Sequence, residues 1–311
     1  MDIDMKELEA FASVVEKGGF SKAAEALFLT QPTISAHVAS LEQKLGVKLL
    51  VRSGREVYPS DAGTLLYGYA REILRLRTSA VEAVEAFTKE MRGSICVAAS
   101  TIPGQYYLPH LIQGFRSRWP DVTFSLRILD SREVAGQVEG REVELGFTGA
   151  AIPLPKCSYE PLCEDQLVLA TPNTPRYRSY SASGYPVRQL AKETFIRREP
   201  GSGTRIETEA FFRELGIDSR GLSAAVEVRS TETIREMVAE GLGVAILSKS
   251  ACGDFAQFGK LLTFDLGSPA LRRRLYLVTR KGAILSPVAQ TFHDFALEFF
   301  RQEEQTEKKS E

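Results

Sequence analysis

Hydroxyl-bearing residues precede three expected helices in the C-terminal two-thirds of the chain. The segments are Ser100-Thr101, Pro200-Gly201-Ser202-Gly203-Thr204-Arg205 and Ser230-Thr231-Glu232. A helix N-terminus offers unpaired backbone N–H groups and the positive end of a dipole, so each segment is suited to binding an anion. Thr148 follows an expected strand and adds a hydroxyl at the sheet edge where open α/β folds bind ligands. Each residue alone is also explained as a helix cap, but the set predicts a shared anion site.

Motifs that would indicate an enzyme, a cofactor or a metal ion do not occur in the sequence. Gly201-Ser202-Gly203 lacks the spacing of a hydrolase nucleophile elbow, and no phosphate-binding loop of the G-x-x-x-x-G-K-[ST] type is present. The 4 cysteines form no C-x-x-C pair and the 3 histidines are far apart, so we expect no metal site. We therefore predict that the protein is not an enzyme and needs no cofactor. Cys157 and Cys163 are expected to be buried thiols, with a redox pair as the alternative.

The hydroxyl-bearing segments belong to a region in which strands and helices alternate. From residue 94 onward, short apolar runs such as 95–99, 123–129 and 143–147 are separated by helical patterns. This alternation predicts parallel sheets covered by helices, arranged as two α/β subdomains. The chain is expected to cross to the second subdomain near Glu164 and to return near Leu266. Two such crossings leave a cleft between two lobes, which is a common ligand site.

A long helical pattern precedes the α/β region and extends from Asp61 to about Met91. Its apolar residues, from Leu66 to Phe87, are spaced three and four apart. At 1.5 Å per residue, such a helix is roughly 45 Å long. We expect it to pair with a second copy as in a coiled coil; packing on its own domain is the alternative.

The first 59 residues predict three short helices followed by a hairpin. The third helix begins at Pro32 and buries an apolar stripe from Ile34 to Leu45. Its opposite face carries short side chains, which let a helix backbone approach the bases of a DNA major groove. The arrangement favours a winged helix-turn-helix over a generic helical bundle. The residues there that can bind bases or phosphates are Gln31, Thr33, Ser35 and His37 on the helix, and Arg52 and Arg55 in the hairpin.

Three stretches of this N-terminal region resemble the LysR-type transcriptional regulators. They are Phe20-Ser21-Lys22-Ala23-Ala24-Glu25-Ala26-Leu27, Thr30-Gln31-Pro32-Thr33-Ile34-Ser35 and Leu41-Glu42-Gln43-Lys44-Leu45-Gly46-Val47-Lys48-Leu49-Leu50. The chain length, the linker helix and the two-lobed region extend the resemblance to the whole chain. Ala36-His37 departs from the Arg-Gln that members often carry, which removes one bidentate contact to a base or phosphate. The segment from Glu199 to Arg205 resembles the branch that includes regulators of sulfur assimilation and of carbon fixation.

The resemblance implies an α/β protein whose effector domain has two lobes, of the type 2 periplasmic-binding-protein kind. The implied domains are a winged helix-turn-helix at 1–60, a dimerising linker helix at 61–92, an effector domain at 93–301 and a flexible tail at 302–311. Lobe I would comprise about 93–164 and 267–301, and lobe II about 165–266. The implied DNA contacts come from Gln31, Pro32, Thr33 and Ser35, with support from Arg52 and Arg55. The implied effector-binding residues are Ser100, Thr101, Thr148, Ser202, Thr204 and Thr231.

The expected function is a sequence-specific DNA-binding transcription regulator whose action depends on a small anionic effector. Sulfur or related anion metabolism is one candidate pathway. The expected partners are a double-stranded DNA operator, the effector and further copies of the chain, as a homodimer that assembles to a homotetramer. RNA polymerase is a further candidate partner.

The composition of the chain excludes or disfavours several other classes of function. The 39 Lys and Arg against 40 Asp and Glu exclude a uniformly basic nucleic-acid coat protein. No apolar run is long enough to cross a membrane, and the acidic N-terminus is unlike a signal peptide, so we expect a cytoplasmic protein. A ligand-binding protein of the periplasmic transporter type is the alternative function, but the N-terminal winged helix argues against it.

Overall fold

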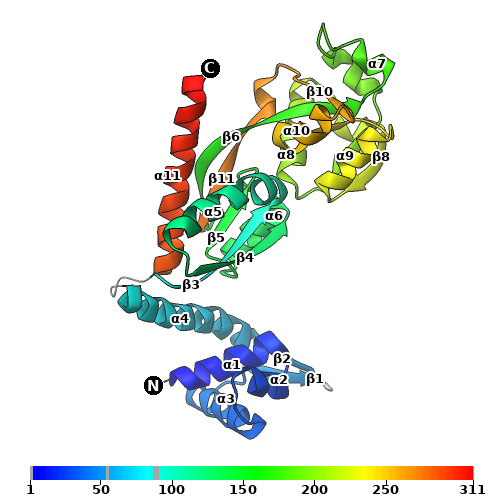
Figure 1. Ribbon diagram of the computed structural model, residues 1–311. Coiled ribbons are helices and arrows are strands. Elements are labelled where there is room, and N and C mark those ends of the chain that lie inside the picture. The colour runs from blue at the N-terminus through cyan, green and yellow to red at the C-terminus, as the bar shows by residue number, and fades with distance from the viewer. Residues whose placement is uncertain (1–2, 54–55, 87–90, 311) are drawn as a thin grey trace. The chain divides into compact units, whose positions relative to one another are not determined.

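The computed structural model describes residues 3–53, 56–86 and 91–310. The chain divides into two compact units, Met1–Glu90 and Met91–Glu311 (Figure 1). Within the described residues, no helix combines the length and the apolar character needed to cross a membrane.

The first unit is a three-helix core with a two-stranded hairpin and a long helix. Its elements are α1 (Met5–Lys17), α2 (Phe20–Ala26), α3 (Gln31–Leu45), β1 (Leu50–Ser53), β2 (Glu56–Pro59) and α4 (Asp61–Ala86). The predicted stripe of α3 is buried, with Ile34 and Leu41 fully enclosed. These side chains pack on α1 around Phe11, which is also fully buried. The arrangement is the predicted winged helix-turn-helix.

A buried carboxylate joins α1 to α3. Glu7 accepts hydrogen bonds from Ser40 Oγ at 2.6 Å and from Lys44 Nζ at 2.8 Å. Burial alone would raise the pKa of Glu7, but these bonds outweigh it and lower the pKa below its usual value. The carboxylate therefore stays charged and holds α3 at a defined place on α1.

The start of α3 differs from the sequence prediction. Helix α2 begins at Phe20, with Gly19 as its cap residue. Thr30 is the N-cap of α3 and accepts a hydrogen bond from the Thr33 backbone N–H. An expected helix beginning at Pro32 therefore starts one residue earlier, at Gln31.

Helix α4 packs on the first unit over only part of its surface. Ala70 is fully buried in the core of the unit, and Leu66 and Tyr67 contact the same core. Leu65, Tyr69, Ile73 and Leu76, spaced three and four apart, form a second apolar stripe that is exposed, and Val81 is exposed beyond it. Packing on its own domain thus accounts for one face of α4 and leaves another face uncovered. The end of the expected helix, at 87–90, lies outside the described residues.

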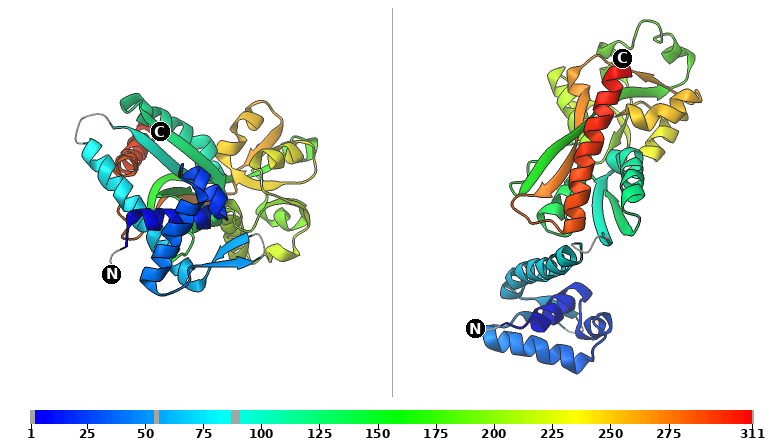
Figure 2. Two further views of the ribbon diagram at one scale, coloured as in Figure 1. Left: turned by 90° about the horizontal axis from the view of Figure 1, so that it is seen from below. Right: turned by 60° about the vertical axis from the view of Figure 1, so that its left-hand side comes forward.

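The second unit contains two lobes that share one long strand. In lobe I, the sheet order is β6-β11-β5-β3-β4, built from β3 (Gly93–Ser100), β4 (Val122–Leu129), β5 (Leu145–Thr148), the first part of β6 (Cys157–Pro172) and β11 (Arg272–Arg280). Strands β3, β4 and β5 are parallel, whereas β6 and β11 run antiparallel to each other. Helices α5 (Leu108–Arg118) and α11 (Pro287–Ser310) cover one face of this sheet, and α6 (Ser131–Glu139) covers the other (Figures 1 and 2).

Lobe II begins where β6 changes its partners. Residues Cys157 to Gln166 of β6 pair with β11, whereas Leu167 to Pro172 pair with β9 (Ala245–Ser248) and β10 (Leu261–Phe264). The short parallel pair of β7 (Phe195–Arg198) and β8 (Ala224–Val228) extends this lobe through a bridge from Phe195 to Val244. Helix α8 (Gly203–Glu214) packs on one side, and α9 (Thr231–Ala239) and α10 (Lys249–Gln257) pack on the other. The remaining short helix is α7 (Pro175–Arg178).

Several elements of the second unit are longer or more numerous than the sequence indicated. Strand β6 has 16 residues and belongs to both lobes. Helix α10 and strand β10 were not foreseen. A π-helical turn over Pro103–Tyr107 precedes α5. Helix α11 continues to Ser310, where the sequence led us to expect a flexible tail.

Candidate functional site

A polar cavity lies between the two lobes of the second unit. The empty space in it, which is partly open to solvent, is about 210 Å³, and its lining comes from the carboxyl ends of β3, β4, β5 and β7 and from β11. The lining residues are Ser100, Thr101, Ile102, Asp130, Ser131, Gly149, Arg198, Ser202, Gly203, Thr204 and Arg273. Strand ends from both lobes therefore meet where the ligand of an open α/β fold is expected.

Four of the six predicted effector residues line this cavity. They are Ser100, Thr101, Ser202 and Thr204, and all four are buried. Thr231 does not line the cavity and lies behind Arg198, bonded to its guanidinium. Thr148 is fully buried beside the lining residue Gly149, and its Oγ1 has no hydrogen-bond partner in the described part of the chain. An orphaned buried hydroxyl is uncommon in proteins.

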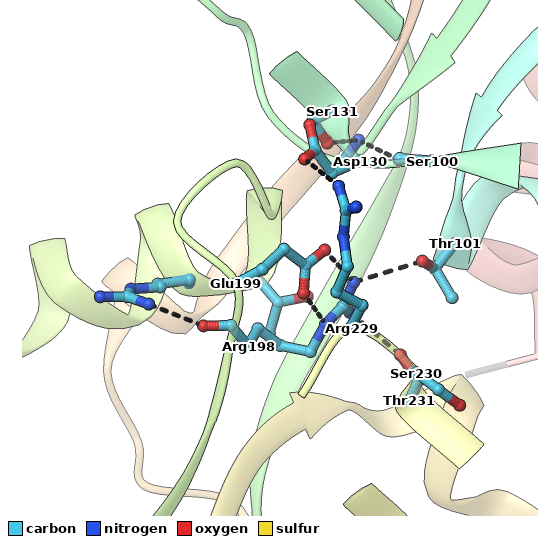
Figure 3. A network of polar contacts seen from close by, with 12 residues as sticks. Ser100, Thr101, Asp130, Ser131, Arg198, Glu199, Arg229, Ser230 and Thr231 are labelled. Atoms are coloured by element: carbon cyan, nitrogen blue, oxygen red, sulfur yellow. Dashed lines mark hydrogen bonds and ion pairs between the residues drawn. The ribbon is translucent and has the colours of Figure 1, made fainter. Parts of the chain in front are cut away.

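Arg198 is the residue that connects the predicted hydroxyls (Figure 3). Its Nη1 donates to Thr231 Oγ1 at 3.0 Å, and its Nη2 donates to Thr101 Oγ1 at 3.3 Å. Glu199 binds the same guanidinium through both carboxylate oxygens, at 2.9 and 2.8 Å. Both side chains are less than a tenth exposed. The charge of Arg198 is thus balanced inside the protein, and its N–H groups face hydroxyls of both lobes.

Arg273 is a second buried arginine that lines the cavity. Arg273 Nε donates to Asp165 Oδ2 at 2.8 Å, and Arg273 Nη1 donates to Thr204 Oγ1 at 3.2 Å. Ser248 Oγ donates to the other carboxylate oxygen of Asp165 at 2.6 Å. Arg273 Nη2 is 2.8 Å from Asp165 Oδ2 but has no partner with hydrogen-bond geometry within the described residues. This N–H group and the Thr148 hydroxyl are the unsatisfied polar atoms near the cavity.

Three helices of the second unit begin near the cavity, and two of them are capped by their own side chains. Asp130 Oδ1 accepts from the Glu133 N–H at the start of α6, at 2.8 Å. Ser230 Oγ accepts from the Thr233 N–H at the start of α9, at 3.1 Å. Ser202, the cap residue of α8, makes no side-chain capping bond in the part of the chain described. Free N–H groups were expected at the helix after Ser100-Thr101, at α8 and at α9. The Ser230 cap makes this expectation wrong for α9, whereas α8 keeps an open N-terminus within the described residues.

The two lobes touch at the cavity through glycines. A Cβ atom on Gly203 of lobe II would lie 2.9 Å from the carbonyl carbon of Gly149 in lobe I. A Cβ on Gly201 would lie 2.4 Å from Asp130 Oδ2. Only residues without a side chain allow such an approach. The loop before α8 therefore contacts lobe I directly beside the cavity.

An ion pair at the cavity rim holds the lobes together as well. Arg229 of lobe II donates to Glu133 Oε1 at 2.7 Å and to Asp130 Oδ2 at 3.3 Å (Figure 3). The backbone N–H of Asp130, followed by Arg229, lowers the pKa of Glu133. Glu133 is consequently a charged partner for Arg229 at neutral pH.

The sequence did not identify the charged residues of the site. Asp130 directly follows β4 at the same sheet edge as Ser100, and Arg198 ends β7 in the sheet of the other lobe, so the ends of these strands were a usable signal for them. Asp130 also begins an Asp-x-x-Glu capping box with Glu133. Arg273 lies on an antiparallel strand 108 residues after Asp165, and no local pattern links the two.

The predicted DNA-contacting residues of α3 lie on its solvent-facing side. Gln31 and Pro32 are exposed, and Thr33, Ser35 and His37 are partly exposed. The hydroxyls of Thr33 and Thr30 are 2.8 Å apart at the helix start. Arg55 lies outside the described residues, as does the side chain of Arg52, whose backbone belongs to β1.

No cluster of metal-binding side chains occurs within the residues that the structure describes. The four cysteines are free thiols. Burial raises the pKa of Cys157, and it raises that of Cys252 to about 12, so neither thiol is poised to react at neutral pH.

Comparisons with known families match both units. The model for the bacterial regulatory helix-turn-helix protein, lysR family, matches residues 5–64, and the model for the LysR substrate binding domain matches residues 88–301. A probable RuBisCO transcriptional regulator of Cyanophora paradoxa is 30% identical over 96% of this chain and 93% of its own. The RuBisCO operon transcriptional regulator of Allochromatium vinosum is 30% identical over 96% of both chains. An uncharacterized HTH-type transcriptional regulator of Escherichia coli, YeiE, is 33% identical over 95% of this chain and 97% of its own.

Solved structures share the fold. A full-length OxyR variant from Pseudomonas aeruginosa aligns with a TM-score of 0.75 at 21% identity, over 97% of this chain and 95% of that one. CbnR complexed with its target DNA aligns with a TM-score of 0.65 at 21% identity, over 94% and 98%. The regulatory domain of Synechocystis CcmR in complex with 2-PG aligns with a TM-score of 0.61 at 25% identity, over 67% and 98%. The names of the relatives point to carbon fixation and do not support the expected link to sulfur metabolism.

Proposed function

Because the chain belongs to the LysR family of DNA-binding transcriptional regulators, and so is not an enzyme, we propose that it senses a small anionic metabolite in the cavity between its lobes. The observation that carries this proposal is the uncapped N-terminus of α8 at a cavity that Arg198 and Arg273 also line. Backbone N–H groups, the helix dipole and the two guanidinium groups all favour a negatively charged ligand there.

The effector class that fits best is a compact organic acid, phosphorylated or not. The buried charges of the cavity walls are already paired, Arg198 with Glu199 and Arg273 with Asp165. Binding therefore depends on hydrogen-bond donors and on small size, because the pocket holds little empty space in this arrangement of the lobes. The neighbours support this class, since CcmR was solved with 2-PG and QuiR with shikimate. The relatives favour control of carbon fixation over sulfur metabolism.

The proposed DNA contacts come from the exposed start of α3 and from the hairpin. The residues are Gln31, Pro32, Thr33, Ser35, His37, Arg52 and Arg55. The N-terminal residues of a recognition helix reach the base edges in the major groove, and wing arginines contact phosphates. The solved complex of CbnR with its target DNA supports this mode of binding for the present chain.

The proposed response to the effector is a shift between two arrangements of the lobes. The lobes contact each other through Gly203 and Gly149, through the Arg229 ion pairs, and through the bond from Arg198 to Thr101. An anion that binds one arrangement more tightly stabilises it, and the change alters the DNA-binding units and their contact with RNA polymerase. A ligand that bound both arrangements equally would have no effect.

The cavity assignment is tested by substituting Ser202 in the full-length protein. Ser202 is buried at the cavity and caps no helix by its side chain within the described residues, so Ser202→Ala should leave the unfolding midpoint nearly unchanged. The variant should lose the thermal stabilisation that 2-PG, shikimate or another small carboxylate gives the wild type. A ligand at 100 times its Kd contributes about 2.7 kcal/mol to the free energy of unfolding.

Ser230→Ala is the matched control, because its hydroxyl caps α9 and does not line the cavity. That variant should lose about 1 kcal/mol of stability and keep the response to the ligand. If Ser202→Ala responded to each anion as the wild type does, the ligand would lie elsewhere. If no small anion stabilised the wild type, the effector class itself would be wrong.

A further inference from the structure

Phe28 adopts a backbone conformation that normally belongs to glycine. It follows the C-cap residue of α2 and has a φ of +54°. Its N–H donates to the Glu25 carbonyl at 3.3 Å, and the Leu29 N–H donates to the Ala24 carbonyl at 2.9 Å. These two bonds define a Schellman motif, in which Phe28 holds the left-handed position.

Other helix ends of the same chain show what this position ordinarily requires. Gly18 and Gly46 end α1 and α3 of the same unit, with φ of +69° and +68°. Gly216, Gly241 and Gly259 end α8, α9 and α10 in the same way. The left-handed conformation is unfavourable for an L-residue with a Cβ, and a bulky side chain makes it an outlier. Arg141, at φ +62°, is the other exception among described residues, but its side chain is polar and partly buried.

Packing does not offset the strain at Phe28. The side chain is 96% exposed, so an aromatic ring is in water instead of in the core. Glycine or asparagine at this position would relieve the backbone and remove the exposed apolar surface. A residue that breaks a local rule twice without a gain in stability is a candidate for a functional role.

The position of Phe28 places it beside the proposed DNA-binding residues. It lies two residues before Thr30, the N-cap of α3, and three before Gln31. Consecutive Cα atoms are 3.8 Å apart, so the Cα atoms of Phe28 and Gln31 are within about 11 Å. The start of a recognition helix is the part that enters the major groove. The ring of Phe28 therefore projects from the turn that leads into that groove.

We propose that Phe28 contacts the operator at the edge of the major groove, through an apolar contact of the kind that a thymine methyl group or a deoxyribose offers. The inference rests on the proposed DNA-binding face of α3 and adds an apolar contact to its polar ones. The left-handed turn directs the ring away from the core, and DNA binding compensates for the strain. Such a contact adds affinity without charge, so it releases no counterions.

The experiment measures the DNA affinity of the full-length protein. The probe is a duplex that the wild type enriches from a random pool. Phe28→Asn should bind it about tenfold more weakly, while the unfolding midpoint stays equal or rises because asparagine tolerates the left-handed conformation. The slope of log Kd against log salt concentration should equal that of the wild type, since no phosphate contact is lost. Replacing the thymines of the duplex by deoxyuridine then separates the two contacts. Weaker binding of the wild type to this duplex indicates that Phe28 contacts the methyl group, and unchanged binding indicates that it contacts the deoxyribose.

Two companion variants keep the result interpretable. Phe258→Asn removes another exposed phenylalanine, 77% exposed with a φ of −83°, and should change neither affinity nor stability. Gln31→Ala tests the proposed face of α3. If Gln31→Ala weakens binding and Phe28→Asn does not, the inference about Phe28 is wrong and the face stands. If Gln31→Ala has no effect either, the face itself is wrong. Loss of transcriptional activation at full DNA affinity would instead make Phe28 a contact for a protein and overturn the proposal.

Discussion

At the scale of single residues, the glycines between the lobes are as important for the cavity as the residues whose side chains donate to it. Arg198 and Arg273 supply donors to the cavity, but the lobes can come together only because position 203 carries no Cβ. A Cβ there would lie 2.9 Å from the Gly149 carbonyl carbon and 3.0 Å from Ser131 Oγ. Real Cβ atoms scarcely approach other heavy atoms so closely, and a backbone atom cannot move aside without moving its lobe.

We therefore expect Gly203→Ala to separate the lobes. The free energy of unfolding should fall by about 1–3 kcal/mol, the usual cost of overpacking, and the effector response should weaken. Chemical denaturation and ligand titration measure both. Gly136→Ala is the control, since a Cβ at that helical position meets nothing within 4 Å and should stabilise α6 by up to about 1 kcal/mol. Equal stability and an equal effector response of Gly203→Ala and Gly136→Ala would contradict contact between the lobes in solution.

At the scale of elements, α11 is attached to β6 through a histidine. His293 Nε2 is 2.8 Å from Glu160 Oε1 on β6, and Nδ1 is 2.9 Å from Asp294 Oδ1. Burial acts to lower the pKa of His293, but the two carboxylates outweigh it and raise the pKa above 6.5. The protonated imidazolium therefore stabilises the attachment of α11 to the sheet.

The raised pKa of His293 determines how its contribution to stability depends on pH. Because the pKa in the folded state is raised, the contribution of His293 is fully present below pH 6.5 and is lost as the pH rises through the raised value. We expect His293→Gln to be less stable than the wild type at pH 6, by less than about 1 kcal/mol because the carboxylates are partly exposed. At pH 9 the two proteins should differ less. Urea unfolding of both proteins at pH 6 and at pH 9 measures the difference in stability. A difference that grew toward pH 9 would show that the predicted direction of the pH dependence is wrong.

At the scale of the whole molecule, the exposed stripe of α4 offers a surface for association between copies of the chain. Ile73 and Leu76 are 42% and 47% exposed on a face that the first unit does not cover. Apolar residues spaced three and four apart along a helix are typical of a coiled-coil partner face. We propose a homodimer through α4 that assembles further to a homotetramer, which presents paired recognition helices to a two-fold related DNA site.

The association is tested by placing a charge in the stripe. Ile73→Glu should reduce the molecular mass in solution by light scattering and weaken binding to a duplex with two half-sites, because a carboxylate in the interface lacks a partner. Thr78→Glu, exposed on the same helix but outside the stripe, should retain the wild-type mass. A wild-type mass for both variants would exclude α4 as the main contact between subunits.

The sequence by itself determined the helix-turn-helix and the alternation of strands and helices in the α/β region. Apolar spacing, proline positions and helix-ending glycines concern residues that are only a few positions apart in the sequence. They can therefore be recognised without knowledge of the fold. Ile34, Val38 and Leu41 are buried as their spacing predicts. The hydroxyls at strand ends were found for the same reason, because a strand followed by a helix places its last residues at a known sheet edge.

Only the tertiary structure decided which of these residues act together. Arg198 reaches Thr101 across 97 residues of sequence, and Arg273 reaches Asp165 across 108. The partner change along β6 that creates two lobes depends on strands more than 70 residues away. Whether a helix N-terminus is capped or open depends on the rotamer of one side chain, as Ser230 and Ser202 show. Such contacts form between distant segments, and local spacing carries no information about them.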